Sequence, residues 1–386
     1  MNSSKFGCRV ILVLGMHRSG TSAITRSLEV LGVNLGDRLR TPRSENPKGF
    51  WEDLDFNDIN AEVLKHFGLD WHTLGYITPD ELRSDRLEPL MSRATDFLRT
   101  RLEKCSVLGL KDPRASRILP FWDAVFQRLD IMPCYVIASR NPLCIAESLK
   151  ARDGFPLMKG VLLWLEYMLG SLSHSSSSPR IVVEYDCVLD DPERELSRMA
   201  QALHLPFHPD ENTFAEYSNN FLSKSLRSTN FSLQNLLDEQ HIPSIIKKLY
   251  SVVYKTAHEN ISINNDILIK NILDIQNDYI KNIELLKLYL KSIEDGEEKT
   301  KSIILLQKKI TFLEQQIDND FNKKKIFNFI YHLKKTTLNI KNSNLLQQIF
   351  KKTSRHTNSL FLIVKSAIST RSLNNIIHEI RIKLKK

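Results

Sequence analysis

The stretch Val10–Gly32, VILVLGMHRSGTSAITRSLEVLG, decides the fold of this chain of 386 residues. Its first five residues are apolar without helical spacing and lead into Gly15, which is typical of a buried strand. A loop runs to Gly20, and a helix begins at Thr21 or Ser22. Glycines at both ends let backbone N–H groups turn inward around an anion, and the helix adds the positive end of its dipole. The stretch therefore predicts a phosphate-binding strand, loop and helix.

Similar short apolar runs recur along the first half of the chain. They lie at Val107–Leu110, Cys134–Ala138 and Ile181–Val183, each bounded by polar or turn residues. Such runs suit strands buried on both faces of a parallel sheet. Helical patterns, such as Ser22–Leu31 and Pro142–Lys150, lie between them. This alternation predicts an α/β fold of the P-loop type, with three layers around a central parallel sheet.

Composition changes sharply after about residue 235, toward Ile, Asn and Lys. Twelve of the 13 glycines lie at or before Gly170, and 13 of the 14 prolines at or before Pro209. Because turns need these residues, the rest of the chain predicts long helices, an all-α C-terminal extension. We divide the chain into an α/β domain at 1–235, a helical or coiled-coil segment at 236–320 and a basic helical tail at 321–386.

Apolar residues of the second segment repeat every three or four positions, in two series that break near Gly296. The first series is Ile269, Ile272, Tyr279, Ile283, Leu286, Leu290 and Ile293, and the second is Ile303, Leu306, Ile310, Leu313 and Ile317. The spacing favours a coiled coil, which would make a homo-oligomer, or a helical hairpin. An amphipathic helix packed on the domain fits it equally well.

The formal net charge of +9 comes from the tail. Residues 321–386 hold 15 Lys and Arg against one acidic residue, whereas residues 1–220 hold 26 against 30. Amphipathic basic stretches such as Lys323–Lys335 could lie on an anionic membrane surface, or bind a partner helix or an acidic glycan. A solvated lysine-rich face is the simpler alternative. No aromatic platform or reading helix is recognisable, so we expect no nucleic-acid partner.

The five cysteines are scattered without C-x-x-C spacing. This argues against a disulfide framework or a zinc site and for a reducing compartment. No apolar stretch approaches the roughly 20 residues of a membrane span, and Val10–Leu14 runs into glycine rather than a cleavage site. We expect a cytoplasmic protein without a metal, whose tail could hold it at the inner face of the membrane.

The loop departs from the nucleotide-triphosphate pattern G-x-x-x-x-G-K-[ST] at one position. Gly15, Gly20 and Ser22 fit, but Thr21 stands where a lysine would reach the β- and γ-phosphates. Arg18 could instead neutralise a smaller anion with its planar fork. A P-loop kinase or NTPase with an altered loop stays an alternative, as does a plain glycine turn.

GMHRSGTS, residues 15–22, resembles the 5′-phosphosulfate loop of the sulfotransferases, especially bacterial members and the tyrosylprotein sulfotransferases, in which an arginine precedes Ser-Gly-Thr. The family transfers the sulfuryl group of 3′-phosphoadenosine 5′-phosphosulfate (PAPS). The resemblance implies that the 5′ end of PAPS binds to Arg18, Ser19, Gly20, Thr21 and Ser22.

A second motif, CYVIASRNPLCIAESLKAR at 134–152, combines a strand, a turn and a helix. Ser148 and Arg152 are four residues apart and share a helix face, and Arg140 ends the strand, so the three could cradle an anion. The motif resembles the 3′-phosphate site of the sulfotransferases, where a serine follows an arginine by eight residues. Arg152 falls where tyrosylprotein sulfotransferases place a further arginine. A solvated strand end and a capped helix remain the alternative.

Two weaker matches extend the resemblance to about residues 8–232. In VVEYDCVLDDP, Tyr185 would reach the nucleotide, although a buried tyrosine at a strand end fits as well. In SLRSTN, Arg227 stands where related enzymes bring a late basic segment over the 3′-phosphate. The resemblance implies nothing about the tail.

Sulfuryl transfer resembles phosphoryl transfer in its demand for positioning and charge stabilisation. Lys111 ends an apolar strand, where an α/β sheet presents ligands, and is our candidate to meet the leaving oxygen beside Arg18. GLKDPR, residues 109–114, resembles the Asn-Lys-Asp-Pro segment of tyrosylprotein sulfotransferases. A solvated Lys111 is the alternative, and Asp112 and Arg114 are expected to pair and order the turn.

The catalytic base is sought in ENPKGFWEDLDFNDIN, residues 45–60, which resembles the Asn-Pro-Lys-Gly-aromatic-aromatic-Glu segment of bacterial sulfotransferases. Glu52 is the first candidate, because desolvation by Phe50 and Trp51 could raise its pKa toward working pH. The other candidates are Glu45, Asp53 and His17. A capping or surface role for Glu52 stays open.

The expected function is that of an enzyme, a sulfotransferase that uses PAPS as co-substrate and an acceptor hydroxyl, which we place on a carbohydrate. Trp51, Trp71, His72 and Tyr76 could line a sugar or peptide site. A further alternative is a non-catalytic nucleotide-binding module whose working part is the coiled coil.

Overall fold

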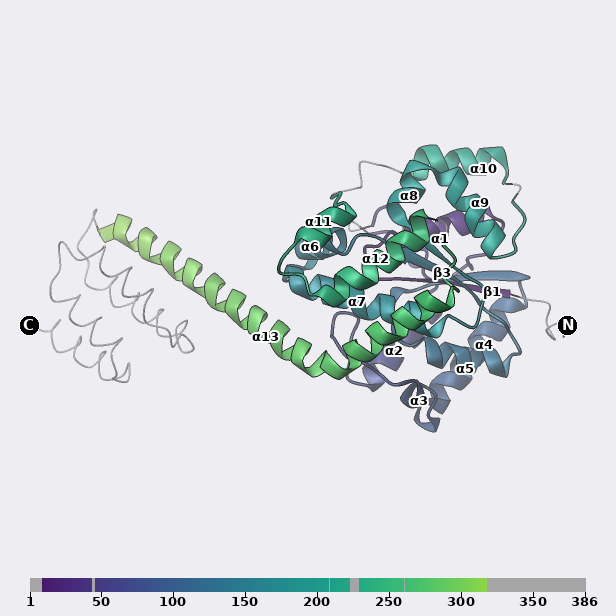
Figure 1. Ribbon diagram of the computed structural model, residues 1–386, viewed down its shortest axis with the longest axis horizontal. Coiled ribbons are helices and arrows are strands. Elements are labelled where there is room, and N and C mark those ends of the chain that lie inside the picture. The colour runs from purple at the N-terminus through teal and green to yellow at the C-terminus, as the bar shows by residue number, and fades with distance from the viewer. Residues whose placement is uncertain (1–8, 44–45, 208, 223–228, 260, 318–386) are drawn as a thin grey trace, which may run out of the picture. The chain divides into compact units, whose positions relative to one another are not determined.

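The computed structural model describes residues 9–43, 46–207, 209–222, 229–259 and 261–317, with residues 299–317 as backbone alone. Within these ranges four strands form one parallel sheet in the order β2-β1-β3-β4. Figure 1 shows β1 and β3 of this sheet with helices around them. The strands are β1 (Arg9–Leu14), β2 (Val107–Lys111), β3 (Cys134–Ser139) and β4 (Arg180–Glu184). Each begins within one residue of a predicted apolar run, so the predicted α/β fold with a parallel sheet is confirmed.

The helices of the described ranges follow the predicted alternation with the strands. They are α1 (Thr21–Val30), α2 (Leu54–His66), α3 (Pro79–Leu82), α4 (Glu88–Leu102), α5 (Leu119–Arg128), α6 (Pro142–Asp153), α7 (Leu157–His174), α8 (Tyr185–Asp190), α9 (Pro192–Ala202), α10 (Glu211–Ala215), α11 (Leu233–Asp238), α12 (Ser244–His258) and α13 (Asp266–Ile317). Two 3₁₀ helices, η1 (Asp85–Leu87) and η2 (Pro113–Arg117), and a π-helix, η3 (Glu216–Phe221), complete the described elements.

The sheet lies between two helical layers because its side chains are buried on both faces. On one face, Val13 and Val136 pack into a core with side chains of α1, α8 and α9. On the other face, Leu12 and Ile137 are also buried, and α12 packs against β4 and α7. This explains why the strand sequences read as continuous apolar runs rather than as alternating ones.

The strand order determines where a ligand can bind. From β1 the chain crosses to β2 on one side of it, then returns to β3 on its other side. The carboxyl ends of β1 and β3 therefore lie at the point where the direction of the crossovers reverses. In open α/β sheets, this point is the usual place for a ligand.

The compact unit that contains the sheet extends to Leu290, farther than the boundary near residue 235 that composition suggests. The helices α11 and α12 and the start of α13 belong to this unit. Ile272, Tyr279 and Ile283 of the predicted apolar series are buried in it. A second unit begins at Lys291, and its described part is the remainder of α13. The coiled-coil pairing stays a prediction, and the basic tail at 321–386 lies outside the described residues.

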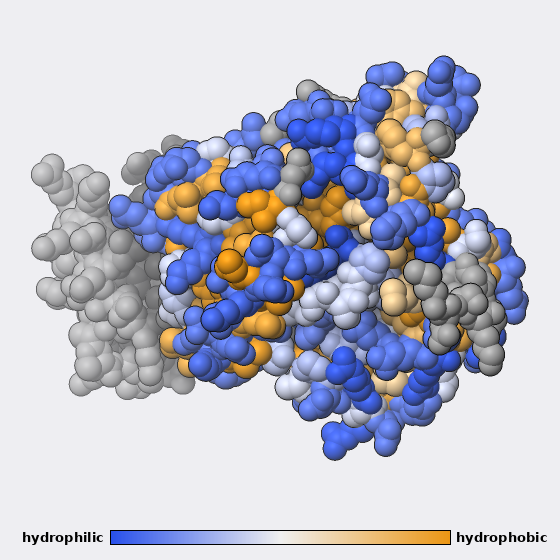
Figure 2. Space-filling model, turned by 45° about the vertical axis from the view of Figure 1, so that its right-hand side comes forward, coloured by the Kyte–Doolittle hydropathy of each residue, from blue (hydrophilic) through white to orange (hydrophobic). Residues whose placement is uncertain are grey.

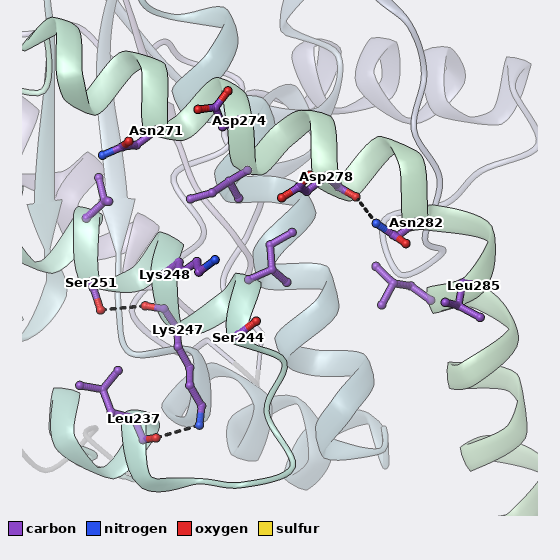
Figure 3. Close-up of a pocket in the computed structure, with 14 residues that line it drawn as sticks. Leu237, Ser244, Lys247, Lys248, Ser251, Asn271, Asp274, Asp278, Asn282 and Leu285 are labelled. Carbon is purple, nitrogen blue, oxygen red and sulfur yellow. Dashed lines mark hydrogen bonds between the residues drawn. The ribbon is translucent and has the colours of Figure 1, made fainter.

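A groove of about 970 Å³ runs along α12 and the first half of α13 (Figure 3). Leu237, Lys247, Asp274 and Leu285 are among the residues that line it, and none of the predicted site residues does. The Lys247 ammonium donates to the Leu237 carbonyl at 2.7 Å, which ties α12 to α11. The groove is thus a feature of the helical layer rather than of the sheet edge.

The surface is mixed in character. Figure 2 shows one face, on which hydrophobic side chains gather in patches among hydrophilic ones. The large apolar side chains that are exposed include Ile267, Leu273, Leu285, Leu288 and Tyr289, all on α13. Among the described helices, none has both the length and the apolar character that crossing a membrane requires.

Candidate active site

A pocket opens at the carboxyl edge of the sheet, between α1 and the segments that follow β2, β3 and β4. It is lined by His17, Arg18, Gly20, Thr21, Ser22, Ala23, Asn46, Pro47, Lys48, Phe50, Glu52, Lys111, Pro113, Arg140, Arg152, Tyr185, Phe221 and Leu222. Five of these side chains are basic and one is a carboxylate. The predicted residues from the loop, from β2, from β3 and from the start of α8 thus meet in one place.

The loop after β1 owes its shape to two glycines. Gly15 has a φ of 126°, and a Cβ there would lie 2.4 Å from the Ala138 carbonyl oxygen. Gly20 has a φ of 81°, and a Cβ there would lie 2.1 Å from the Tyr185 ring. Both positions demand glycine, because other residues would meet both a steric clash and an unfavourable backbone conformation.

Ser19 holds the turn of the loop rather than facing the pocket. It is fully buried, and its hydroxyl donates to the Met16 carbonyl at 2.6 Å. Gly20 then begins α1 without a side-chain cap, so the first N–H groups of the helix are left for another acceptor. This arrangement suits an anion at the helix end.

Arg18 stands between the loop and α6. Its backbone is left-handed, with a φ of 70°, which is a sparsely populated conformation for arginine. Its Nε donates to the Ser148 hydroxyl at 2.8 Å. Burial, followed by repulsion from Arg152 and Arg140, lowers the pKa of the Arg18 guanidinium. Ser148 therefore contacts the pocket through Arg18, and three guanidinium groups repel one another across it.

Arg140 forms the opposite wall, at the end of β3. It is 4% exposed, and its Nη2 donates to the Thr229 carbonyl at 2.9 Å. Its Nε is buried without a hydrogen-bond partner among the described residues. The guanidinium lies 5.1 Å from the centroid of the Tyr185 ring, whose edge meets Gly20. Tyr185 thus contacts both Gly20 of the loop and Arg140 after β3.

Arg152 lies on the same side of the pocket, at the end of α6. Its guanidinium pairs with Asp153 at 2.8 Å and lies 5.2 Å from the centroid of the Trp71 ring. Its charge is therefore partly compensated.

Lys111 and Glu52 form a buried ion pair on the floor of the pocket. The ammonium lies 2.6 Å from Glu52 Oε1, 3.0 Å from the Phe50 carbonyl and 3.4 Å from the Ser22 hydroxyl. Both side chains are at most 5% exposed. The end of β2 thus brings an ammonium group to the N-terminus of α1, as its position after the strand predicts.

The pKa of Glu52 differs from the expectation drawn from its aromatic neighbours. Burial does act to raise it, but the Lys111 ammonium and the hydrogen bonds from Asn57 and Lys111 outweigh burial. The net effect lowers the pKa below its ordinary value. Glu52 is therefore a firmly ionised partner of Lys111, and it can accept a proton only when that lysine turns away.

The other candidate bases lie in different surroundings. Asp53 caps α2 and pairs with Arg101 at 2.9 Å, which is a structural role. His17 lines the pocket, and its Nε2 is buried without a partner among the residues that the structure describes. Burial lowers the pKa of His17 well below 6.5, so the imidazole is neutral. Glu45 lies outside the described residues.

The turn after Lys111 is ordered by a pair that the sequence suggests. Asp112 caps η2, and both of its oxygens lie within 3.1 Å of Arg114 Nε. Asn60 of α2 donates to the same carboxylate at 3.0 Å. This fixes the backbone that carries Lys111.

An aromatic cluster borders the pocket beside His17 and Arg152. The centroid of the Trp71 ring lies 4.7 Å from that of the His17 ring and 5.8 Å from that of the Phe155 ring. His72 stacks on Phe155, with the two ring centroids 5.7 Å apart. Trp51 lies elsewhere, where it packs edge-on against Phe221. Tyr76 lines a small cavity beside Arg117 and Glu166. The aromatic residues named from the sequence are thus divided among three places, and Phe155 joins Trp71 and His72 without any sequence signal.

Several lining residues were not singled out from the sequence. Asn46 donates to the Ser22 hydroxyl at 3.1 Å, and Lys48 donates to the Asn220 carbonyl at 2.8 Å. Both belong to the segment ENPKGFWE, whose resemblance to bacterial sulfotransferases could have identified them as pocket residues. Phe221 and Leu222 come from the end of η3, in a stretch that carries no motif.

Some predictions cannot be placed. Arg227 falls in the range 223–228, outside the described residues. Among the residues that are described, no group of three or more His, Cys, Asp or Glu side chains is arranged to hold a metal ion.

The solved structures to which the chain is similar include two sulfotransferase domains. The sulfotransferase domain from the Synechococcus PCC 7002 olefin synthase is 15% identical, with 70% of this chain and 94% of that chain covered and a TM-score of 0.36. The sulfotransferase domain from the curacin biosynthetic pathway is 16% identical, with 70% and 97% covered and a TM-score of 0.34. No family model and no curated protein matches the chain. At these TM-scores the likeness says nothing about the chemistry of this chain. Any proposal about that chemistry is based on the side chains of the site.

Proposed function

We propose that this protein is a sulfotransferase that moves the sulfuryl group of PAPS to an acceptor hydroxyl, with a carbohydrate as the favoured acceptor. The observation that carries the proposal is that Arg18 and Arg140, from the ends of two adjacent strands, line one pocket. PAPS is an adenosine with a phosphosulfate at one end and a phosphate on its 3′ oxygen. Two separate basic groups in one pocket suit a ligand with two separate anionic groups.

The residues present fit such a donor. Arg140 Nε is a buried donor without a partner among the described residues, and an unsatisfied buried donor costs about 1–3 kcal/mol unless a ligand group fills the place. Arg18 and the uncapped end of α1 would hold the 5′ phosphosulfate, and Arg140 the 3′-phosphate. An anion would also relieve the repulsion that lowers the pKa of Arg18. At about 190 Å³ the pocket is smaller than the roughly 300–1,000 Å³ of typical ligand sites, so we expect Phe221 and Lys48 to move when the donor binds.

The positions of the side chains support the chemistry that we assign to them. The donor supplies a sulfuryl group whose bond to the phosphate oxygen breaks as the acceptor oxygen bonds to sulfur. Lys111 lies 3.4 Å from the Ser22 hydroxyl, at the helix end, where its ammonium can neutralise charge on the leaving phosphate oxygen. The acceptor's proton passes to a base, for which Glu52 is the first candidate once Lys111 has turned toward the donor. His17, neutral and facing the pocket, is the second.

The proposed acceptor face is the cluster of Trp71, His72 and Phe155. Trp71 touches two lining residues of the pocket, His17 and Arg152, so a molecule stacked on it would hold a hydroxyl near the donor. Flat aromatic rings suit the faces of sugars, which supports the carbohydrate acceptor. The specific sugar is open to a screen.

A P-loop kinase or NTPase is the second candidate, favoured by the proximity of Lys111 to Ser22, since this ammonium could replace the missing lysine of the loop. The two candidates differ in what they bind. A triphosphate needs Mg²⁺, whereas the sulfotransferase donor does not.

The test is ligand binding followed by transfer. In thermal denaturation without Mg²⁺, 3′-phosphoadenosine 5′-phosphate should raise Tm, by an amount that corresponds to about 2.7 kcal/mol at 100 times Kd. Labelled sulfate from PAPS should then appear on a member of a panel of glycans, lipids and peptides, with glycans expected.

The control is Lys111→Ala, which should bind the same bisphosphate and lose transfer by orders of magnitude. Stabilisation by ATP with Mg²⁺ but not by the bisphosphate would overturn the proposal in favour of a kinase or NTPase. Unchanged transfer in Lys111→Ala would remove the lysine from the chemistry, and binding with no transfer to any of the panel would favour the non-catalytic module.

A further inference from the structure

A single buried arginine fixes the loop that carries Trp71. Arg117, in η2, donates to the Asp70 carbonyl at 2.8 Å, to the Thr73 carbonyl at 2.9 Å and to the Gly75 carbonyl at 3.1 Å. Its side chain is 2% exposed. Three carbonyl groups within six residues thus converge on one planar guanidinium, which leaves the loop little freedom.

This guanidinium is itself held by a carboxylate of α7. Glu166 forms an ion pair with Arg117 and accepts the Gly75 N–H at 2.9 Å. The next residue, Tyr167, donates its hydroxyl to the Trp71 carbonyl at 2.7 Å. Loop, η2 and α7 are therefore joined by charged hydrogen bonds, which are stronger than neutral ones.

The network ends on α13, in the segment that composition assigns to the helical extension. The Tyr279 hydroxyl donates to the same Glu166 oxygen that accepts from Gly75. Tyr279 is 1% exposed, and the space left among these side chains is about 20 Å³, room for about one water. Removing this hydroxyl would leave the Glu166 oxygen with the Gly75 N–H as its described partner, in a space that admits about one water, and so would weaken the network.

At its other end the network reaches the pocket. The Trp71 ring lies against His17 and under the Arg152 guanidinium, and both of these residues line the pocket. The ring orientation depends on the backbone between Asp70 and Gly75, because this backbone is anchored before Trp71, at the Trp71 carbonyl, and again at two residues after it.

We propose that Tyr279 is a positioning residue for the acceptor face, acting through Glu166 and Arg117 on the loop that carries Trp71. That this loop binds the acceptor rests on the proposed function. That Tyr279 holds the loop in place does not. The first turns of α13 are thus a working part of the catalytic unit rather than an appendage.

The experiment compares Tyr279→Phe with Tyr250→Phe in the full chain. Tyr250 is a matched control, because it also donates from a buried tyrosine to a buried carboxylate, Glu184, at 2.8 Å. Hydrogen exchange of the amides in 70–75 and acrylamide quenching of Trp71, isolated by comparison with Trp71→Phe, report the loop. We expect Tyr279→Phe to speed this exchange about tenfold and to raise quenching, and Tyr250→Phe to change neither.

Binding of 3′-phosphoadenosine 5′-phosphate distinguishes the positioning role of Tyr279 from the proposed sulfotransferase function. Equal affinity in Tyr279→Phe and wild type, with a loosened loop, supports a role confined to the acceptor face. Failure of the wild type to bind this bisphosphate would sink the proposed function and leave the loop measurements intact. Exchange in 70–75 that stays within twofold of wild type in Tyr279→Phe, or that rises equally in both variants, would overturn the positioning role.

Discussion

At the scale of single residues, Lys111 and Glu52 show how one contact decides between two roles. A carboxylate beside two aromatic rings suggests a base with a raised pKa. In the structure the pKa of Glu52 is lowered instead, because the Lys111 ammonium lies 2.6 Å from its Oε1. The partner comes from β2, 59 residues along the chain. Local sequence could show the rings but could not show the lysine.

Breaking this pair should be costly. Glu52→Gln leaves the Lys111 ammonium buried without its counter-charge, so the free energy of unfolding at pH 7 should fall by about 3–5 kcal/mol. Because the folded state lowers the pKa of Glu52, the stabilisation exists above its ordinary value of 4.5 and is lost as pH falls through and below it. The deficit of Glu52→Gln in urea denaturation should therefore shrink as pH falls from about 5 to about 2.

Lys111→Met combined with Glu52→Gln provides the control. The double variant buries no lone charge, so it should lose less stability than the sum of the single variants. A deficit that is additive and independent of pH would show that the two groups do not form an ion pair in solution.

At the scale of elements, the loop after β1 and the helix α1 depend on two glycines in left-handed conformation. Gly20 precedes α1 and touches the Tyr185 ring, whereas Gly32 follows α1 with a φ of 77° and open space around it. The two positions share the same backbone demand and differ only in what a Cβ would meet.

Substitution by alanine separates these effects. Gly32→Ala should cost about 1–2 kcal/mol, the penalty of a left-handed conformation. Gly20→Ala should cost more, because the Cβ would displace the Tyr185 ring on which the Arg140 guanidinium lies, and it should also abolish binding of the bisphosphate. Equal Tm values for the two variants, with binding retained in both, would contradict the assigned role of the loop.

The elements themselves were readable from sequence, and the exceptions have a physical cause. Apolar runs buried on both faces and the alternation with helices predicted every strand of the described sheet, and the glycine spacing predicted the loop. Phe221 and Leu222 could not be predicted as pocket residues, because their place depends on packing of η3 against α1. The first turns of α13 read as an extension, since their apolar spacing does not reveal whether the domain or another helix covers it.

At the scale of the whole molecule, the strand order unites motifs about 120 residues apart. β1 and β3 are neighbours, so the arginines that follow them reach the same pocket. The sequence could pair these motifs through resemblance, whereas adjacency of their strands required the fold. That Arg152 would pair with its neighbour Asp153, and that Ser148 would contact Arg18, required side-chain positions.

The central claim is that the two ends of one donor are held by Arg18 and Arg140. Isothermal titration of wild type and Arg140→Met with 3′-phosphoadenosine 5′-phosphate and with adenosine 5′-monophosphate tests it most directly, because the ligands differ by the 3′-phosphate alone. The account predicts that wild type prefers the bisphosphate by about 10-fold to 100-fold, the worth of a charged hydrogen bond, and that Arg140→Met loses this preference while its affinity for the monophosphate is unchanged. Equal affinity of wild type for both ligands, or equal losses for both in Arg140→Met, would contradict it.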